Sequence, residues 1–355
     1  MNILYYGEPD IAQGGGVGKV AYYLPRALRK KVSVTYLRGI KSTKNFPEIY
    51  FNVFSQFVKK EFDIIHFNAN PAWINGSSML LRFAKLRQTR TVLNIHGIPQ
   101  LERRAEQWHE SVSFIYWMPT LSYCNLADRI VVNSEYMRNN VVVWYRVNRD
   151  KVAVIPNGVD LKMFAGSNDR IMLEGDPSVL YVGHLSGLKG VDILIQAITK
   201  LRSELPNIKL HLVGRGNDPY FAALAKKEGI EKHVVFHGFA EHSMLPSYYR
   251  SADICVFPSR HEGFGLVILE AMASGIPVIA SDIPSFREII SDGSDGRLFK
   301  LEDADALSKA VIALYQDPHL RKELSRNAFE KATRYSWENI ADKYISLYKC
   351  LCDEL

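Results

Sequence analysis

Short runs of β-branched and aromatic residues alternate with helical patterns along the whole 355-residue chain. This alternation is typical of βα units that build parallel sheets. The polar segment 156–177 divides the strand-like runs into two sets. The first set comprises Ile3–Tyr6, Val32–Leu37, Ile64–Phe67, Thr91–Ile95, Ile130–Asn133 and Val152–Ile155, and the second comprises Val179–Val182, Lys209–Val213, Val234–Phe236, Ile254–Phe257 and Val278–Ala280. The sequence therefore predicts two α/β domains.

The chain is longer than a single hydrophobic core usually serves, which agrees with two domains. We expect a first domain at residues 1–160, a second at 161–335 and a terminal helix at 336–355 that packs back on the first. The apolar residues of that terminal segment lie close to one helical face, which favours a structural role. Open α/β sheets bind ligands at the carboxyl ends of their strands, so each domain should present a crevice there. Two such crevices can face each other across a central cleft.

Composition narrows the function classes. With 47% hydrophobic and 23% charged residues, the chain is typical of a globular protein. Its apolar runs are short and interrupted by charges, and Met1–Tyr6 is typical of a strand and not of a signal peptide, so we expect a cytoplasmic protein. Four cysteines in this context predict neither a disulfide framework nor a metal site. The net charge of +6 suits phosphorylated ligands or anionic lipid, and no basic stripe with interleaved aromatics indicates nucleic acid.

Two features of the first domain follow strands. Glycines 14–16 come after the first strand and open a helix, so the backbone of Gly15 and Gly16 can approach a phosphate or sugar. The run matches neither a Walker loop nor G-x-G-x-x-G, and a flexible loop is the alternative. His96 directly follows Thr91–Ile95, where its imidazole can hydrogen-bond a substrate; a structural histidine satisfied by backbone is the alternative.

Two loops of the second domain carry charge beside predicted helix starts. Lys189 lies just before the helical stretch 191–205, and a cation beside free helix N–H groups suits a diphosphate. Its alternative is a solvated surface lysine. The string 258–277 places Glu262 before a helix and Glu270 about two turns along it, so both carboxylates can accept hydrogen bonds from sugar and ribose hydroxyls. The alternatives are a helix-dipole carboxylate at 262 and an exposed helical residue at 270.

At this string the chain resembles glycosyltransferase family 4, a retaining family with the GT-B fold, over nearly its whole length. Glu262 and Glu270 match the E-x7-E pattern within Pro258–Pro277. Supporting matches are the Gly14–Gly16 loop, His96-Gly97, Val131–Ser134, Ile155–Asp160, Leu212–Gly216 and Val235–Gly238.

The resemblance implies a site. Glu262 would contact the donor sugar, Glu270 the ribose, Lys189 the phosphate, and His96 the sugar near the reaction centre. The remaining donor contacts would come from Gly15, Gly16, His184, Gly214, Arg215, Gly238 and Phe239, and from Gly263, Phe264, Gly265, Leu266 and Val267. Transfer would be phosphate-assisted on one face of the sugar, with no protein nucleophile, metal or cofactor. The family usually has Arg where this chain has His184, and Arg215 and Arg260 are the candidate replacements.

The acceptor is less defined. The first domain should select a glycan, lipid-linked or small-molecule acceptor, with Ser134 and Trp108 on that side. The basic, apolar stretch Met79–Arg90 can lie against anionic lipid or form a solvated face.

The only Asp-x-Asp, at 303–305, is better explained by helix capping than by metal. UDP- and GDP-sugars both remain open. There are two alternatives. One is another GT-B enzyme, such as an inverting transferase or nucleotide-sugar epimerase, and the other is a non-catalytic sugar-nucleotide-binding protein.

Overall fold

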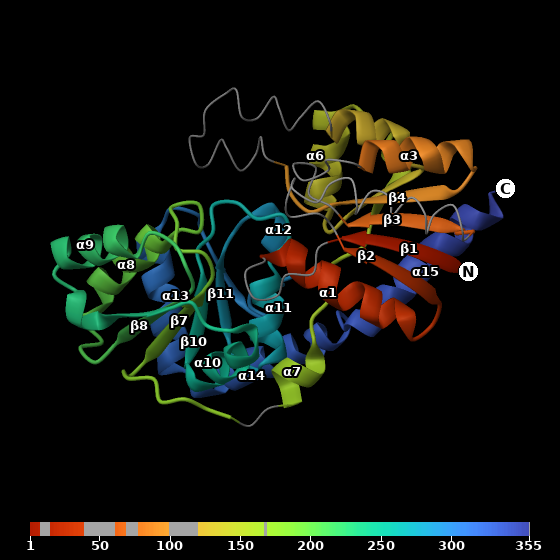
Figure 1. Ribbon diagram of the computed structural model, residues 1–355. Helices are drawn as coiled ribbons and strands as arrows, with labels where there is room; N and C mark the ends of the chain where they lie inside the picture. Colours follow the sequence, from red (N-terminus) through yellow and green to blue (C-terminus); the bar gives the residue numbers. More distant parts are fainter. Residues whose placement is uncertain (8–14, 39–60, 69–76, 99–119, 167–168, 355) are drawn as a thin grey trace. The chain divides into compact units, whose positions relative to one another are not determined.

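The computed structural model describes residues 1–7, 15–38, 61–68, 77–98, 120–166 and 169–354. The chain divides into two compact units, residues 1–158 with 337–355 and residues 159–336 (Figure 1). The chain passes from one unit to the other between residues 158 and 159 and returns between residues 336 and 337.

Unit 1 is a parallel sheet between two layers of helices. Its strands are β1 (Asn2–Gly7), β2 (Ser33–Arg38), β3 (Ile64–Asn68), β4 (Arg90–Ile95), β5 (Arg129–Val132) and β6 (Val152–Val154), in the order β2-β1-β3-β4-β5-β6. Its helices are α1 (Gly16–Arg29), α3 (Ser77–Leu86), α6 (Glu135–Tyr145) and α15 (Trp337–Asp353), with a 3-10 turn at Arg149–Lys151. Strand residues point alternately to the two faces. One face packs on α1 and α15, and the other on α3 and α6 (Figure 1).

The terminal helix α15 belongs to unit 1. Trp337, Ile340, Tyr344 and Tyr348 are buried in the same core as α1, and the ring of Tyr23 stacks on that of Trp337 with centroids 5.7 Å apart. Two exposed ion pairs tie the same two helices, Lys30 to Glu338 at 2.6 Å and Lys31 to Asp342 at 2.5 Å. The helix therefore covers the face of the sheet that also carries the polar ends of β3 and β4.

Unit 2 repeats the architecture with another strand order. Its strands are β7 (Ser178–Val182), β8 (Lys209–Val213), β9 (Val234–Gly238), β10 (Ile254–Phe257), β11 (Val278–Ser281) and β12 (Arg297–Phe299), in the order β12-β11-β10-β7-β8-β9. Its helices are α7 (Leu161–Gly166), α8 (Val191–Leu201), α9 (Asp218–Lys227), α10 (Leu245–Ser251), α11 (Leu266–Ala273), α12 (Pro284–Arg287), α13 (Ala304–Gln316) and α14 (Pro318–Thr333), with 3-10 turns at Glu231–His233 and His242–Met244. One face packs on α8, α9 and α13, and the other on α7, α10, α11 and α14.

The predicted α/β fold with two Rossmann-like units is confirmed. Every predicted strand is present, and its ends move by two residues at most. The sequence pattern missed β12 because three residues that begin with an arginine are too short to show a period. All four cysteines are free. Among the described residues, no helix combines the length and the apolar character needed to cross a bilayer.

Candidate active site

Strand order reverses in unit 2 between β7 and β10, and such a switch point is where open α/β sheets bind ligands. The loops that follow these two strands, 183–190 and 258–265, lie against each other. Gly190 has a φ of +70°, and a Cβ there would lie 2.0 Å from the carbonyl oxygen of Pro258. The backbone N–H of Arg260 donates to the carbonyl of Leu188 at 2.9 Å. Only glycine at position 190 permits this close approach of the two loops.

Lys189 and Glu262 form an ion pair across these loops. Lys189 Nζ lies 2.8 Å from Glu262 Oε1, and the two side chains are 25% and 19% exposed. The hydroxyl of Ser259 donates to the same carboxylate oxygen at 3.3 Å. Burial, and after it the negative charge of Glu262, raises the pKa of Tyr181 well above its usual value. The family resemblance implies separate ligands for Lys189 and Glu262, whereas in the structure the two side chains are direct partners.

Two helices begin beside this ion pair. Gly190 caps α8, and Gly265 caps α11. The first N–H groups of an α-helix have no acceptor within the helix and favour a negative charge. The predicted donor-contact residues Gly263, Leu266 and Val267 are half-buried at the start of α11, and Phe264 is buried. The arrangement combines one cation, one carboxylate and two helix N-termini at a switch point, which is chemically suited to a phosphorylated sugar.

Glu270 lies in the middle of α11 and is only 2% exposed. The hydroxyl of Tyr249 donates to its Oε2 at 3.4 Å. Burial, and after it the charge of Glu270, raises the pKa of Tyr249 well above its usual value. The alternative that Glu270 is an exposed helical residue is therefore wrong. Every residue of α11 from Ile268 to Ala273 is buried, so this part of the helix has no exposed face. Its contact with ribose stays a prediction.

Arg260 does not replace the arginine that the resemblance leads one to expect at position 184. Its guanidinium binds Asp192 through two hydrogen bonds of 2.7 and 2.8 Å and Glu302 through two of 2.5 and 2.7 Å. The hydrogen bonds to Asp192 raise the pKa of Arg260 further above its usual value. Two carboxylates already balance this cation, so it holds loop 258–265 to α8. His184 itself is exposed.

Arg215 lies in the loop after β8, and its guanidinium carbon is 4.1 Å from the centroid of the Phe239 ring. Both side chains are exposed. No carboxylate among the described residues forms an ion pair with Arg215. Backbone hydrogen bonds join the loops around it: Gly214 N–H donates to the carbonyl of Gly238 at 2.8 Å, and Leu185 N–H to that of Arg215 at 2.7 Å. A Cβ at Gly214 would lie 1.8 Å from the carbonyl oxygen of Gly183, so this junction also requires glycine.

In unit 1 the glycine run behaves as predicted in one respect: Gly15 caps α1, which begins at Gly16. Gly14 lies outside the described residues. Gly15 and Gly16 are exposed, and a Cβ at Gly15 would meet no atom within 4 Å. Their approach to a phosphate or sugar stays a prediction.

His96 follows the end of β4 and is half-buried. Its Nε2 lies 2.9 Å from Oδ1 of Asn68, the last residue of β3, so a side chain and not the backbone satisfies it. Asn68 Oδ1 also accepts from Asn94 Nδ2 at 3.2 Å. Burial lowers the pKa of His96 to about 4. Sequence reasoning missed Asn68 and Asn94, although Asn68 follows an apolar strand just as His96 does.

Of the two predicted acceptor-side residues, the structure describes only Ser134. Ser134 is fully buried, and its hydroxyl accepts from Met137 N–H at 3.1 Å as the N-cap of α6. Trp108 lies outside the described residues. Contact of Ser134 or Trp108 with an acceptor stays a prediction.

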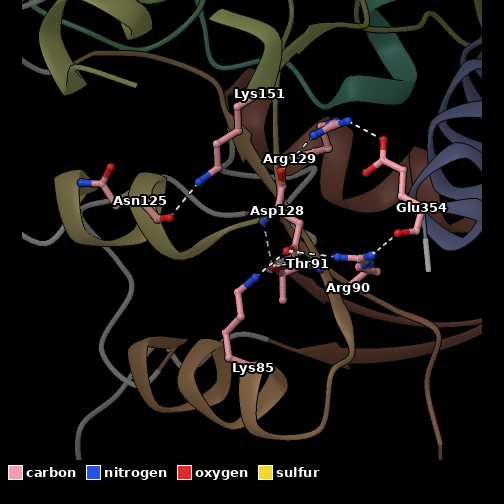
Figure 2. Close-up of polar contacts among 8 residues, drawn as sticks. All are labelled: Lys85, Arg90, Thr91, Asn125, Asp128, Arg129, Lys151 and Glu354. Carbon is pink, nitrogen blue, oxygen red and sulfur yellow. Dashed lines mark hydrogen bonds and ion pairs between the residues drawn. The ribbon is translucent and has the colours of Figure 1, made fainter. Parts of the chain in front are cut away.

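The opposite edge of the unit 1 sheet holds a cluster of charges (Figure 2). Asp128 accepts from Lys85 Nζ, and its other oxygen accepts from the N–H and hydroxyl of Thr91 at 2.8 and 2.7 Å. Burial alone would raise the pKa of Asp128, but these hydrogen bonds outweigh it and hold the pKa below its usual range. Arg90 donates to the carbonyl of Glu354, whose carboxylate pairs with Arg129 at 2.7 Å. Lys85 and Arg90 of the basic stretch are thus engaged within the protein.

No group of three or more His, Cys, Asp or Glu is placed to hold a metal ion within the described ranges. The Asp-x-Asp at 303–305 is a helix cap, as predicted, because Asp303 Oδ1 accepts from the N–H of Ala306 at 2.8 Å. Asp305 pairs with Lys200 at 2.8 Å.

The chain is similar in sequence to known proteins. A profile described as "Glycosyltransferase Family 4" matches residues 31–163, and one described as "Glycosyl transferases group 1" matches residues 168–331. A phosphatidyl-myo-inositol mannosyltransferase of Mycolicibacterium smegmatis is 35% identical over 202 residues, which cover 55% of this chain and 51% of that protein. The chain spans between about half and three fifths of the length of the curated relatives that it matches.

Solved structures match over the whole chain. Sucrose-phosphate synthase from Thermosynechococcus elongatus has a TM-score of 0.79 at 23% identity and covers 100% of both chains. The Anabaena protein HepE, solved in complex with UDP-glucose, has a TM-score of 0.74 at 18% identity and covers 99% of this chain and 100% of its own. The fold is therefore that of the GT-B class. The two profiles together match most of the chain, which belongs to glycosyltransferase family 4.

Proposed function

We propose that the protein is a retaining hexosyltransferase that moves a sugar from a UDP- or GDP-sugar to a hydroxyl group of a glycan, lipid-linked or small-molecule acceptor. The Lys189–Glu262 ion pair beside the first residues of α8 and α11 carries this proposal. Family membership supports it, as does the UDP-glucose bound by HepE, which has the same fold.

The donor diphosphate would bind Lys189 Nζ, in place of Glu262, and the N–H groups at the helix starts. Preformed positive charge stabilises the departing phosphate. Glu262 would then be free to accept hydrogen bonds from sugar hydroxyls, and Glu270 would serve the ribose. Arg215 and Phe239, with Gly214 and Gly238, would border the base, and His96 would contact the sugar.

In the transfer step, the bond between the anomeric carbon and the diphosphate oxygen breaks, and the acceptor oxygen bonds to the same face of that carbon. The acceptor proton moves to the departing phosphate oxygen. The step needs no protein nucleophile, metal or cofactor.

The acceptor side is proposed on fewer observations. Relatives named for phosphatidyl-myo-inositol and D-inositol 3-phosphate make inositol compounds the first acceptors to test. A peripheral contact with the cytoplasmic face of a membrane is supported by Leu86, 80% exposed on α3 beside the exposed Arg82 and Arg87. Co-sedimentation with anionic liposomes at low salt tests this contact, and no lipid-dependent pelleting overturns it.

Thermal-shift screening against UDP-glucose, UDP-N-acetylglucosamine and GDP-mannose tests the donor. A ligand that binds only the native protein at about 100 times its Kd raises stability by about 2.7 kcal/mol, so one nucleotide class should raise Tm clearly. NMR of the product should show the donor's anomeric configuration, and turnover should survive EDTA.

Other outcomes identify the alternatives. An inverted product indicates an inverting transferase, and an epimerised sugar nucleotide without acceptor indicates an epimerase. Binding without turnover across the acceptors indicates a non-catalytic protein, and silence across all donors overturns the proposal.

A further inference from the structure

A buried polar cluster lies between the unit 1 sheet and α15. It comprises Tyr5 on β1, His66 and Asn68 on β3, Asn94 on β4, and Tyr344 and Tyr348 on α15, all less than 4% exposed. The rest of this core is largely apolar. Buried polar groups without partners cost about 1–3 kcal/mol each, so such a cluster on a packed face calls for an explanation.

Strand register places the cluster beside His96. Asn68 of β3 pairs directly with Asn94 of β4. Residues two apart on a strand point to the same face, so His66 and Asn68 point toward α15, as does Asn94. His96 follows two residues after Asn94. The cluster therefore reaches from the terminal helix to the carboxyl edge of the sheet, at the place where strand order reverses between β1 and β3.

Hydrogen bonds join α15 to His96 through Asn94 and Asn68. Asn94 Nδ2 lies 2.9 Å from the Tyr344 hydroxyl and 3.2 Å from Asn68 Oδ1. Asn68 Oδ1 in turn lies 2.9 Å from His96 Nε2. On the same face, His66 Nδ1 bonds the Tyr348 hydroxyl. The side chain of Asn94 thus links α15 to the amide that contacts His96.

These contacts decide which ring nitrogen of His96 carries the proton. Asn68 Nδ2 lies 3.4 Å from the carbonyl oxygen of Val17, which only accepts, so this end of the amide is the NH2 group. Asn68 Oδ1 accepts from Asn94 at the other end. Since Oδ1 cannot donate, His96 Nε2 must carry a proton, and in the neutral ring Nδ1 then holds the lone pair.

We propose that Asn68 is a positioning residue, which fixes His96 with its proton on Nε2 so that Nδ1 accepts a hydrogen bond from a hydroxyl of the bound donor sugar. The last part of this statement rests on the proposed function, and the tautomer does not. Asn94 and Tyr344 hold the Asn68 amide, so the C-terminal helix supports the site as well as the core.

The titratable groups among the described residues of the cluster are all uncharged at neutral pH, so none of them places a charge beside His96. They are His66 on β3, Tyr5 on β1, and Tyr344 and Tyr348 on α15. Burial lowers the pKa of His66 to about 3 and raises the pKa of each tyrosine above its usual value. None of them carries a charge at neutral pH, and burial keeps His96 neutral there too.

Nitrogen-15 NMR of histidine-labelled full-length protein tests the tautomer directly, with His96→Gln to assign the signal. The wild-type spectrum should show a protonated Nε2 and an unprotonated Nδ1 at pH 7. A proton on Nδ1 would overturn the proposal without reference to any activity.

Asn68→Asp tests positioning, because a carboxylate beside the imidazole favours its charged form and raises the His96 pKa. The ring should then gain a proton on Nδ1 near neutral pH and lose its acceptor. We expect kcat to fall as pH drops and the ring takes up this proton, by up to about tenfold, the size of one lost hydrogen bond of about 1–1.5 kcal/mol, and to recover toward pH 9. Asn140→Asp on α6 makes the same substitution where Asn140 bonds only its own helix, at Tyr136 O, and should keep the wild-type profile.

The two readouts separate the two proposals. An unchanged His96 pKa in Asn68→Asp overturns the positioning role. A raised pKa with a wild-type pH profile of kcat leaves the tautomer standing and overturns the contact between His96 and the donor sugar. If Asn68→Asp does not fold, the wild-type spectrum still decides the tautomer.

Discussion

The carboxyl edges of the two sheets are built from different chemistry. In unit 2 the edge carries a charged pair, Lys189 and Glu262, on loops that glycines bring together. In unit 1 the edge carries neutral groups, Asn68 and His96, held by side-chain hydrogen bonds that lead back to α15. The same strand architecture thus supports two ways of placing functional groups.

The difference fits two tasks. Fixed charges and helix N-termini suit a diphosphate, whose charge grows as the sugar leaves. A neutral imidazole or amide can accept a hydrogen bond from a sugar hydroxyl. A charged imidazolium has only donors and cannot accept one. The charged edge depends on local loop geometry, whereas the neutral edge depends on residues far apart in sequence. A substitution can therefore disturb one edge and leave the other unchanged.

Removing the cation should have the largest effect on catalysis. Lys189→Ala should lower kcat roughly a hundredfold, the usual scale for losing one preorganised transition-state contact. Steady-state turnover at saturating donor measures this. Lys200→Ala is the matched control, because within the described part of the chain Lys200 forms an ion pair only with the exposed Asp305. Near-wild-type turnover of Lys189→Ala would remove this lysine from the mechanism.

Gly190→Ala should damage the charged edge through the backbone. A residue at φ +70° costs roughly 1–2 kcal/mol and overpacking about 1–3 kcal/mol, so we expect a loss of about 3 kcal/mol. For a unit of this size, that corresponds to a Tm decrease of roughly 5–10 °C. Gly187→Ala in the same loop is the control, because a Cβ there meets no atom within 4 Å. Equal melting temperatures for the two variants would contradict the close approach of the loops.

The charged edge could be predicted from sequence because its residues lie in two continuous segments of the chain. Loop 183–190 and string 258–277 each contain their glycines, charges and helix start. What could not be predicted is the pairing. Arg260 meets Glu302, 42 residues away, and Asp192, 68 residues away, so its charge looked available when only the sequence was considered. Local patterns do not report such long-range partners.

The neutral edge could be predicted only in part. The strands and the terminal helix were visible as apolar periods, and His96 stood out at a strand end. Its partners are spread over Asn68, Asn94 and Tyr344, and no spacing joins them. Polar residues inside or just after apolar strands were the available signal. Their meaning depends on register between β3 and β4, which only the structure supplies.

Acid should destabilise the neutral edge. Burial lowers the pKa of His66 to about 3 and of His96 to about 4, against about 6.5 when unfolded. The unfolded state therefore binds more protons below pH 6.5, and stability falls as pH drops toward these values. Each histidine should contribute a loss of about 2–3 kcal/mol between pH 7 and 4.5.

Urea unfolding at pH 7 and 4.5 measures this loss, and tryptophan fluorescence assigns it, because Trp73, Trp108, Trp117, Trp144 and Trp337 all belong to unit 1. His66→Gln should reduce the difference between the two pH values, while His319→Gln, at an exposed position, should not. A wild-type pH dependence in His66→Gln would show that this ring is not held neutral in the core.

The smallest effect should come from Arg215, the candidate replacement whose charge no carboxylate of the described residues balances. An exposed cation–π contact such as that with Phe239 is worth about 0.5–1 kcal/mol, and a phosphate or base contact at this exposed site should be of similar size. Arg215→Ala should therefore raise donor KM about fivefold and leave kcat nearly unchanged, since about 1.4 kcal/mol corresponds to tenfold. Arg326→Ala on α14 is the control, because among the described residues its guanidinium bonds only the neighbouring Asn327, at 3.4 Å. If KM stays unchanged and kcat falls instead, Arg215 acts on the departing phosphate together with Lys189, and the charged edge extends from β7 and β10 to β8.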